Sequence, residues 1–518
     1  ARLLRGRGRT LLVLGDRGRG KSFLLGLALA LAIHERQAGR VHVVAPSPAS
    51  AASLYRGLKA GLEALGYGGL YRERLESGYT ARLWGPWFSV IHRSPESAEP
   101  APLLVVDEAA AVGVARVRRL SWRSGRVMVA STVHGYEGSG RVLVHVLEAD
   151  LPRPLARVEL GEPIRYRRGD PLEEWVLRAF HLDAEPPSVP PEKALGATCR
   201  TVPRGRLGPW DAYTSRLLGV LAQAHYRFEP DYILVALESS NHELIALEAP
   251  GGEPVAAADV AIEDPSMEEA ARLGLKALST HAPEAAGLRG ARIVRIAVSP
   301  PLQRMGLGTR ILRCAEAHAA KHGALVVTAL FSRHDVLGFW VENGYLVAYI
   351  SPRYNRATGE KNVCVAKPLA PGARGAVEEA SSAFRVRLLL SLQSIYRDLA
   401  AERVPLILEA TAPSHHRPVA LTGDMERRLS EFLAGRLDLE QAFDAVWAAA
   451  VDCLASRSPS SLGLTQREAT ALAARILQGK PLNDVAYTLS TTMSEAHATA
   501  SQAARRLLEA CTAPTGAS

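Results

Sequence analysis

The chain has few cysteines, few aromatic residues and no long hydrophobic run. Its 518 residues include only five cysteines, and aromatic residues make up 6%. The cysteines stand far apart without a Cys-x-x-Cys pair, at Cys199, Cys314, Cys364, Cys453 and Cys511. This spacing suggests neither a zinc site nor a disulfide framework, and it fits a reducing, cytoplasmic setting. No stretch reaches the roughly 18 apolar residues that a membrane span needs, so we expect no membrane partner and no zinc.

Apolar and basic residues are present in ample number. Hydrophobic residues make up 47% and charged residues 22%, as in an ordinary globular protein. The length exceeds a single core and predicts about three domains. The formal net charge is +9, and arginine greatly outnumbers lysine, which suits contacts with phosphate groups. The composition favours an anionic macromolecule as a partner, while a basic surface that serves solubility is the alternative explanation.

Short apolar runs separated by turns and helices dominate residues 1–182. Continuous β-branched runs that alternate with helices indicate an α/β domain, whose parallel sheet is covered on both faces. The expected strands lie at 10–14, 41–45, 103–106 and 127–130, and the first expected helices at 21–37 and 49–65.

Three further regions follow. Proline is frequent in residues 183–210, which predicts a linker. Residues 211–370 return to short strands and helices, whereas the apolar spacing of residues 371–518 is helical throughout. In the third region we expect strands at 232–239, 242–250, 255–263 and 292–299, and helices near 267–280 and from 306.

A glycine-rich loop follows the first apolar run. Residues 15–22 read GDRGRGKS, which fits G-x-x-x-x-G-K-[ST] between a strand and an apolar helix. In such a loop the backbone N–H groups face phosphates, Lys21 reaches the β and γ phosphates, and Ser22 can bind Mg²⁺. The sequence therefore predicts an ATP site with Mg²⁺. Its predicted loop residues are Gly15, Asp16, Arg17, Gly18, Arg19, Gly20, Lys21 and Ser22.

Acidic residues after a later strand complete this predicted site. The segment LLVVDEAA places Asp107 and Glu108 at the carboxyl edge of the predicted sheet. We assign Asp107, together with Ser22, to Mg²⁺ and Glu108 to activation of the attacking water. The stretch STVHGYEGSGR, 131–141, is either a sensor of the γ phosphate or a polar turn. Arg165 is either a residue that reaches the phosphates or a solvated basic group.

A second glycine-containing loop follows the strand near residue 298. The segment RIAVSPPLQRMGLGTRIL, 295–312, places Gln303, Gly306 and Gly308 at the start of a helix. It resembles the Q/R-x-x-G-x-G/A loop of the GCN5-related acetyltransferase fold, whose N–H groups bind the pyrophosphate of acetyl-CoA. The downstream segment VLGFWVENGYLVAYI resembles the helix and strand that close this fold. A tight strand-to-helix turn without a ligand is the alternative.

Seven segments, in one order, carry a wider resemblance. They are GDRGRGKS, VVDEAAAV, STVHGYEGSGR, EPIRYRRGDPLEEW, AHYRFEPDY, RIAVSPPLQRMGLGTRIL and FWVENGY. Together they resemble the tRNA(Met) cytidine acetyltransferase family over residues 10–370. Residues 371–518 match only as a basic helical, RNA-binding region. The fold implied is a RecA-like P-loop module, a GCN5-related N-acetyltransferase α+β domain and an all-α carboxyl-terminal region.

The resemblance also implies an activity. It implies acetyl transfer from acetyl-CoA to the N4 amine of a cytidine in RNA, while ATP hydrolysis drives an RNA-handling step. The implied partner is tRNA or another structured RNA, with the wobble cytidine of elongator tRNA(Met) as the first expectation. His225 takes the place of a histidine suspected in catalysis, and Arg165 joins the ATP site. The acetyl-CoA-binding residues implied are Ile296, Ala297, Val298, Gln303, Arg304, Met305, Gly306, Leu307, Gly308, Thr309 and Asp335.

Several positions depart from the family's pattern. Ser299 stands where the family has histidine, Glu342 where a basic residue is common, and Trp340 where many members of the fold have a tyrosine. A carboxylate at Glu342 would repel the phosphates of the coenzyme. Only about 14 residues precede the first loop, where the family has a further domain, so we expect either a shortened member or a chain without that domain.

Two other functions stay open at this point. One is a protein lysine N-acetyltransferase with an ATPase module. The other is an RNA-remodelling ATPase whose acetyltransferase domain has decayed into a binding module.

The carboxyl-terminal sequence reads as short helices joined by turns. Thr465 and Glu468 are spaced as a capping box. The spacing resembles a helix-turn-helix, although a plain helical bundle is the simpler interpretation. His415 and His416 are adjacent but have no further ligands nearby, so no metal site is expected there.

Overall fold

The computed structural model describes residues 9–95, 97–133, 148–208, 210–222, 232, 235, 238–332, 334–355, 360–416 and 418–512. Contacts divide the chain into two compact units. The first contains residues 1–260, 294–315 and 355–360, and the second contains residues 261–293, 316–354 and 361–518. Among the described residues, no helix combines the length and the apolar character that crossing a bilayer requires.

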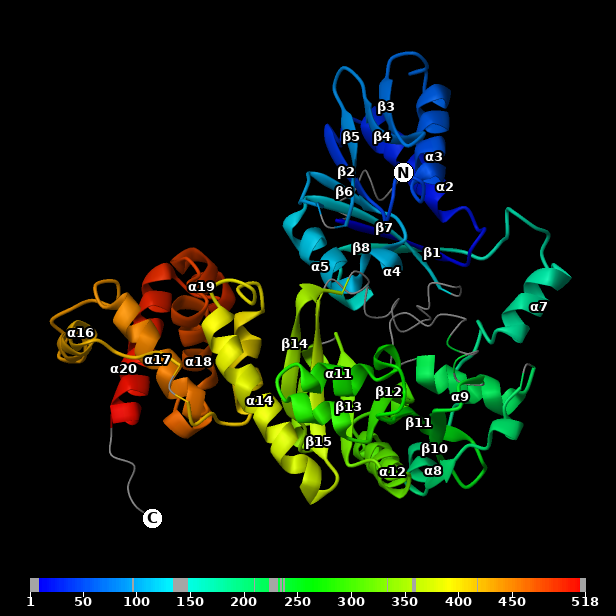
Figure 1. The fold of residues 1–518 in the computed structure, drawn as a ribbon. Coiled ribbons are helices and arrows are strands. Elements are labelled where there is room, and N and C mark those ends of the chain that lie inside the picture. Colours follow the sequence, from blue (N-terminus) through cyan, green and yellow to red (C-terminus); the bar gives the residue numbers. More distant parts are fainter. Residues whose placement is uncertain are drawn as a thin grey trace. The chain divides into compact units, whose positions relative to one another are not determined.

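An eight-stranded sheet forms the amino-terminal part of the chain, drawn in blue and cyan in Figure 1. The strand order is β3-β4-β5-β2-β6-β7-β1-β8. The strands are β1 (Thr10–Gly15), β2 (Arg40–Val44), β3 (Arg72–Glu76), β4 (Tyr79–Trp84), β5 (Ser89–Arg93), β6 (Leu103–Val106), β7 (Arg126–Thr132) and β8 (Leu155–Leu160). The helices are α2 (Lys21–His34), α3 (Ala52–Ala64), α4 (Ala109–Val112), α5 (Val114–Arg123) and α7 (Pro171–Ala179).

The predicted parallel sheet is confirmed in β5-β2-β6-β7-β1-β8, where all neighbouring strands run parallel. Its two faces carry separate hydrophobic cores. Val13 belongs to one core, and Leu12 and Leu14 belong to the other, as the alternation of side chains along a strand requires. The antiparallel strands β3 and β4, which extend the sheet beyond β5, were not predicted from the sequence.

Helices α2 and α3 cross at two glycines. A Cβ atom added to Gly26 would lie 2.1 Å from the carbonyl oxygen of Leu54, and one added to Gly57 would lie 2.2 Å from that of Phe23. Both contacts are with backbone atoms, which cannot rotate away as a side chain can. The close approach of the two helices therefore depends on the absence of a side chain at these positions.

We expect Gly57→Ala to destabilise the amino-terminal module by about 1–3 kcal/mol, because the extra methyl group forces α2 and α3 apart. Gly68→Ala is the matched control, since an added Cβ there meets only the side chain of Glu63, at 4.0 Å. Hydrogen exchange of α2 and α3 peptides measures the difference. Equal protection in the two variants would contradict this account of the helix crossing.

A second, seven-stranded sheet has the order β14-β15-β13-β12-β11-β10-β9. Its strands are β9 (Thr198–Thr201), β10 (His242–Glu248), β11 (Pro254–Glu263), β12 (Gly290–Val298), β13 (Val326–Phe331), β14 (Leu346–Tyr354) and β15 (Lys361–Pro368). The accompanying helices are α8 (Pro191–Leu195), α9 (Ala212–Ala222), α11 (Leu273–Ser279), α12 (Leu307–Lys321) and α13 (Leu337–Glu342). Short 3₁₀ helices lie at η1 (Arg204–Arg206), η2 (Glu269–Ala271), η3 (Pro283–Gly287), η4 (Pro300–Leu302) and η5 (His334–Val336).

Two sequence expectations in this region need correction. The proline-rich stretch 183–210 contains α8 and β9, and β9 is the edge strand that pairs with β10. The run 232–239 was expected to be a strand, but of its described residues Tyr232, Val235 and Glu238 are helical, and Ser239 belongs to neither a helix nor a strand. A short apolar run fits a buried helix as well as a strand, so periodicity alone does not distinguish them.

The carboxyl-terminal region is helical, as expected (Figure 1). Its helices are α14 (Pro371–Ser391), η6 (Ala401–Arg403), α15 (Val404–Glu409), α16 (Gly423–Leu433), α17 (Phe443–Ser456), η7 (Ser460–Leu462), α18 (Gln466–Leu472), the π-helical turn η8 (Ala473–Leu477), α19 (Leu482–Leu489) and α20 (Met493–Thr512). The predicted capping box is confirmed at the start of α18, where Thr465 and Glu468 cap each other's backbone N–H groups.

This helical region packs on strand β14. The hydroxyl of Ser381, on α14, donates to the carbonyl of Val347 at 2.7 Å. The hydroxyl of Tyr396 donates to the carbonyl of Ile350 at 2.8 Å. The backbone N–H of Val347 donates to the carbonyl of Ala410 at 2.7 Å. The first helices of the region therefore satisfy backbone groups of the sheet.

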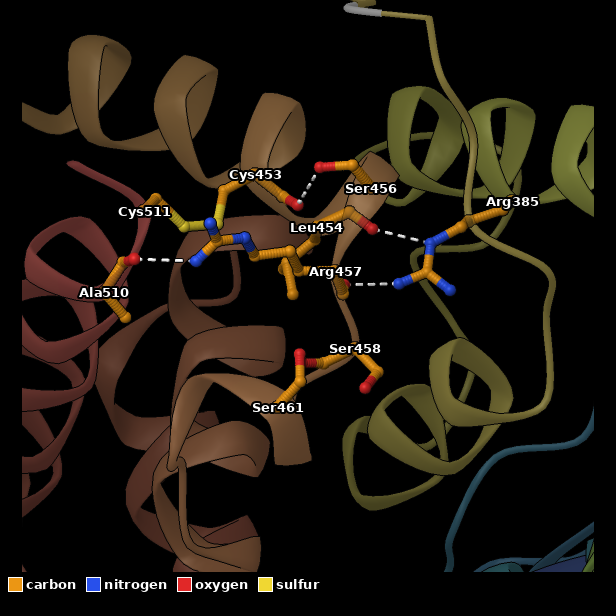
Figure 2. The surroundings of a disulfide bond; sticks show 9 residues. All are labelled: Arg385, Cys453, Leu454, Ser456, Arg457, Ser458, Ser461, Ala510 and Cys511. Atoms are coloured by element: carbon orange, nitrogen blue, oxygen red, sulfur yellow. Dashed lines mark hydrogen bonds between the residues drawn. A yellow bond between two sulfur atoms is a disulfide. The ribbon is translucent and has the colours of Figure 1, made fainter. Parts of the chain in front are cut away.

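The structure contradicts the expectation that the cysteines form no disulfide framework. Cys199 on β9 is bonded to Cys314 on α12, and Cys453 on α17 is bonded to Cys511 on α20 (Figure 2). The partners are 115 and 58 residues apart in sequence, yet their Cα atoms lie 6.2 and 6.1 Å apart. Spacing along the chain cannot reveal such pairs, because the fold alone brings the partners together. Cys364 is a buried free thiol.

Candidate functional site

The loop between β1 and α2 adopts the backbone conformation that its glycines allow. Gly18 and Gly20 both have φ +81°, in the left-handed region that favours glycine. Gly20 is the residue that caps α2, whose first residue is Lys21. The N–H groups at this helix start are thus available to an anion, as the sequence predicts.

The two predicted Mg²⁺ ligands lie together. The hydroxyl of Ser22 donates to Oδ1 of Asp107 at 3.0 Å, although the two residues are 85 positions apart. Asp107 is 1% exposed. The backbone N–H of the next residue, Glu108, donates to the same carboxylate at 3.1 Å. A hydroxyl beside a buried carboxylate fits Mg²⁺, which prefers hard oxygen ligands. The ammonium of Lys21 donates to the carbonyl of Asp16, 2.9 Å away, and so lies over the loop.

A later segment lies against this loop. The backbone N–H of Ile164 donates to the carbonyl of Gly18 at 3.0 Å, and that of Arg165 is 3.4 Å from the same oxygen. A Cβ added to Gly20 would lie 2.6 Å from Cδ1 of Ile164. The fold therefore places the backbone of Arg165 beside the first loop, and its side chain is exposed.

Arg19 differs from the other loop residues. Its guanidinium forms an ion pair with Glu173, at 2.9 Å, and the residue is 9% exposed. The side chain thus anchors the loop to α7, so only the backbone of Arg19 is available to a phosphate. The sequence could not indicate this pairing, because Glu173 lies 154 residues away.

Two predicted features lie outside the described residues. These are His225 and most of the stretch 131–141, of which only residues 131–133 are described. Their predicted roles stay predictions.

The second loop joins β12 to α12. Arg304 and Gly306 have φ +66° and +79°, and α12 begins at Leu307. A Cβ added to Gly306 would meet no atom within 4 Å, so open space lies beside the loop. The side-chain amide of Gln303 donates to the carbonyl of Val298 at 3.3 Å and ties the loop to the strand. A left-handed turn before a helix start, open on its outer side, fits a diphosphate.

Strand β12 leaves its neighbour β13 before this loop. The parallel register between the two strands runs from Gly290–Val326 to Ile293–Ala329 and includes no pair at residues 296–298. On the other side, the N–H of Ser299 donates to the carbonyl of Val255 on β11 at 3.0 Å. The end of β12 is therefore held by β11 but does not pair with β13. An extended coenzyme arm could pair with the backbone there, as predicted for Ile296 to Val298.

The residues that depart from the family's pattern also have clear positions. Trp340 is 4% exposed and stacks on Phe331, with ring centroids 5.9 Å apart. Trp340 also makes an edge-to-face contact with Tyr345, whose hydroxyl donates to Glu316 at 3.0 Å. Burial, with the charge of Glu316, raises the pKa of Tyr345. Trp340 is thus part of an aromatic core. Asp335 and Glu342 are exposed, and Asp335 lies on the short helix η5.

One buried polar pair of the second sheet was not predicted from the sequence. His242 on β10 contacts Asp259 on β11, and both are buried. The available signal was a carboxylate inside the apolar strand sequence VAAADVAIE, since a buried charge needs a partner.

Two family models match the chain. The model described as RNA cytidine acetyltransferase NAT10/TcmA, helicase domain, matches residues 12–183. The model of the acetyltransferase (GNAT) family matches residues 211–356.

Curated relatives match nearly the whole chain. It is 48% identical to the tRNA(Met) cytidine acetyltransferase TmcA of Aeropyrum pernix, over 98% of this chain and 70% of that protein. It is 31% identical to TmcA 2 of Saccharolobus solfataricus, over 94% of this chain and 66% of the relative. The TmcA of Methanopyrus kandleri is 32% identical, over 86% of this chain and 55% of the relative. The chain thus spans between about half and 70% of the length of these relatives.

Solved structures match about a third of the chain. A Chaetomium thermophilum Naa20 in complex with a bisubstrate analogue is 19% identical, covers 35% of this chain and 92% of that chain, and gives a TM-score of 0.26. The ribosomal-protein-S18-alanine N-acetyltransferase from Escherichia coli is 16% identical, covers 34% of this chain and 94% of that chain, and gives a TM-score of 0.24.

Proposed function

The chain belongs to the tRNA(Met) cytidine acetyltransferase family, and from this we propose that it acetylates the N4 amine of a cytidine in RNA with acetyl-CoA, assisted by ATP hydrolysis. The proposed substrate is tRNA, with the wobble cytidine of elongator tRNA(Met) as the first candidate. The observation that carries the proposal is the presence of two strand-to-helix loops with left-handed glycines, at 15–22 and 303–309. Each offers backbone N–H groups to a different anion.

The first loop is proposed to bind ATP with Mg²⁺. Ser22 and Asp107 would hold the metal ion, and Lys21 would release the carbonyl of Asp16 and bind the β and γ phosphates. Glu108 would orient the attacking water, and Arg165 would stabilise charge on the γ phosphate from the segment beside the loop. Bound Mg²⁺ would supply neutralisation of the phosphate charge.

The second loop is proposed to bind acetyl-CoA. The backbone of residues 303–309 would hold the diphosphate, and the unpaired end of β12, at 296–298, would bind the pantetheine arm. Asp335 is exposed and remains a weaker candidate, because a carboxylate repels the phosphates of the coenzyme. His225 remains a candidate catalytic residue on the family resemblance.

The chemistry explains why two anion sites would occur in one chain. The lone pair of a cytidine amine is delocalised into the ring, so the amine is a weak nucleophile and needs proton removal during attack. The target base must also leave its stack before it can enter a site. An ATPase module that rearranges structured RNA would present the base to the acetyl group.

Nucleoside mass spectrometry tests this proposal directly. The full chain is incubated with tRNA and labelled acetyl-CoA, with ATP, without ATP, and with a non-hydrolysable ATP analogue. We expect labelled N4-acetylcytidine, most of it only with ATP. Label on protein lysines that needs neither RNA nor ATP would favour the lysine acetyltransferase. RNA-stimulated ATP hydrolysis without bound acetyl-CoA would favour the RNA-remodelling ATPase.

We expect Gly306→Ala to weaken acetyl-CoA binding by about tenfold. Alanine at φ +79° is strained by about 1–2 kcal/mol, so the loop relaxes and must be re-formed on binding. A steric clash does not cause the expected loss of affinity, since a Cβ added to Gly306 meets no atom within 4 Å. Titration calorimetry with acetyl-CoA measures the change, and Gly287→Ala, also in open space but without positive φ, is the control. Unchanged affinity would exclude the loop as the diphosphate site.

A further inference from the structure

A polar row, of which two members are buried, crosses three neighbouring strands of the second sheet. His242 lies on β10, Asp259 on β11 and Arg295 on β12, which are consecutive in the sheet order. His242 is 8% exposed and Asp259 is 0% exposed. Burying charged groups costs free energy unless they are paired, and such groups are concentrated at functional sites. The row therefore needs an explanation that packing alone does not supply.

The imidazole of His242 has one occupied and one open nitrogen. Nδ1 lies 2.9 Å from Oδ1 and 3.2 Å from Oδ2 of Asp259, so the carboxylate accepts the Nδ1 hydrogen. Within the described part of the chain, Nε2 makes no hydrogen bond, and it is not sealed from solvent. A carboxylate on Nδ1 leaves the lone pair on Nε2, which is the tautomer of a proton acceptor.

Two further groups, Arg295 and Tyr232, lie near the carboxylate of Asp259. The guanidinium of Arg295 lies 3.7 Å from the ring centroid of Tyr232, and Tyr232 is buried. Burial, and then the negative charge of Asp259, raises the pKa of Tyr232, whereas the charge of Arg295 lowers it. Asp259, on the middle of the three strands, is thus hydrogen-bonded to the imidazole and lies close to Arg295 and Tyr232. Among the described residues, Arg204 also contacts His242, because its guanidinium donates to the backbone carbonyl of His242 at 2.8 Å.

The row lies at the proposed acetyl-transfer site. Arg295 directly precedes Ile296, the first residue of the segment proposed to bind the pantetheine arm. Ala297 of that segment belongs to the same buried cluster as Tyr232 and Leu244. Neighbouring strands are about 4.8 Å apart, so side chains that leave the same face of β10 and β12, with β11 between them, start roughly 10 Å apart.

We propose that His242, oriented by Asp259, accepts the proton of the cytidine N4 amine during acetyl transfer, a role that rests on the proposed function. Nε2 takes one N4 proton as the N4–C bond forms at the acetyl carbonyl. The C–S bond then breaks, and the imidazolium returns the proton to the departing thiolate. The balance is one N4-acetylcytidine and one CoA thiol from one cytidine and one acetyl-CoA. Arg295 and Tyr232 are positioning residues that act through Asp259.

The test measures acetylation of tRNA by the full chain under single-turnover conditions from pH 5.5 to 9. We expect His242→Gln to lower the rate constant about 100-fold and to remove the acidic limb of the pH–rate profile, with the KM for acetyl-CoA unchanged. Asp259→Asn should lower the rate less and move that limb. His181→Gln is the matched control, because His181 is also buried and contacts a backbone carbonyl, that of Gly208, at 3.2 Å.

Further measurements separate chemistry from folding. Nitrogen-15 NMR of labelled histidine should show the Nδ1–H tautomer at His242 in the unmodified chain and its loss in Asp259→Asn. Should His242→Gln fail to fold, His242→Ala with added imidazole replaces it, and we expect imidazole to restore acetylation. A rate for His242→Gln within threefold of the unmodified chain overturns the proposal, as does an acidic limb that only His225→Gln removes. If the unmodified chain forms no N4-acetylcytidine, the proposed function itself has failed.

Discussion

Lys21→Ala is expected to lower ATP hydrolysis by roughly 1000-fold while acetyl-CoA binding stays unchanged. Lys21 begins α2 directly after the left-handed Gly20, and its ammonium lies over the loop, 2.9 Å from the carbonyl of Asp16. That contact is a local one which a γ phosphate can replace. Without the ammonium, the phosphates would lose the point charge that draws them onto the backbone N–H groups.

A steady-state ATPase assay with tRNA present measures the effect, and calorimetry with acetyl-CoA serves as the second readout. Lys193→Ala, an exposed lysine on α8, is the control and should keep full activity. If acetylation of tRNA continued at the normal rate in Lys21→Ala, ATP hydrolysis would not be coupled to the transfer. ATP hydrolysis at the normal rate in Lys21→Ala would instead show that this loop does not form the ATP site.

Arg385→Met is expected to destabilise the carboxyl-terminal helices by about 3–5 kcal/mol. Arg385 is 1% exposed, and Figure 2 shows its guanidinium donating to the backbone carbonyls of Leu454 and Arg457. Nε donates to the carbonyl of Leu454 at 2.6 Å, Nη1 to those of Leu408 and Thr411 at 2.7 and 2.9 Å, and Nη2 to that of Arg457. Methionine has no donor, so it would remove these hydrogen bonds, although the carbonyl of Leu408 also accepts from the hydroxyl of Thr411 at 3.1 Å.

The charge of Arg385 has a favourable position. Leu408 and Leu454 lie in the last turns of α15 and α17, where the helix dipoles place partial negative charge. Burial lowers the pKa of Arg385 to about 10, so the group remains a cation at neutral pH. Lysine has no planar fork, so Arg385→Lys should recover only part of the loss.

Hydrogen exchange of peptides from α14 to α20 is the suitable measurement, because a chain with several units does not unfold in one step. Arg374→Met, an exposed arginine on the same helix, is the control. Equal exchange in the two variants would show that the carbonyls around Arg385 find other partners.

Features that depend on short segments could be predicted from the sequence. The order strand, glycine turn, helix at GDRGRGKS is a local pattern, and the structure has β1, a left-handed Gly20 and α2 at those positions. The same is true of the loop after β12 and of the capping box at Thr465 and Glu468. Asp107 and Ser22 were placed together because the carboxyl ends of parallel strands share one edge of the sheet.

Features that depend on pairs of residues far apart in the chain could not be predicted from the sequence. The pairing of Arg19 with Glu173 and of His242 with Asp259 joins different elements, and neither partner marks the other in sequence. Strand β9 was hidden in a proline-rich stretch because an exposed edge strand of four residues has no apolar run to mark it. The helical conformation of Tyr232 was missed because its short apolar run is compatible with two structures.

The sequence by itself determined the two glycine-containing strand-to-helix loops and the family, because the residues of each loop are neighbours along the chain and their spacing alone sets the turn. Only the tertiary structure decided the disulfides Cys199–Cys314 and Cys453–Cys511, the hydrogen bonds of Arg385 to backbone carbonyls, and the His242–Asp259 pair. These contacts form between residues 17 to 115 positions apart, and their geometry follows from which strands and helices pack side by side.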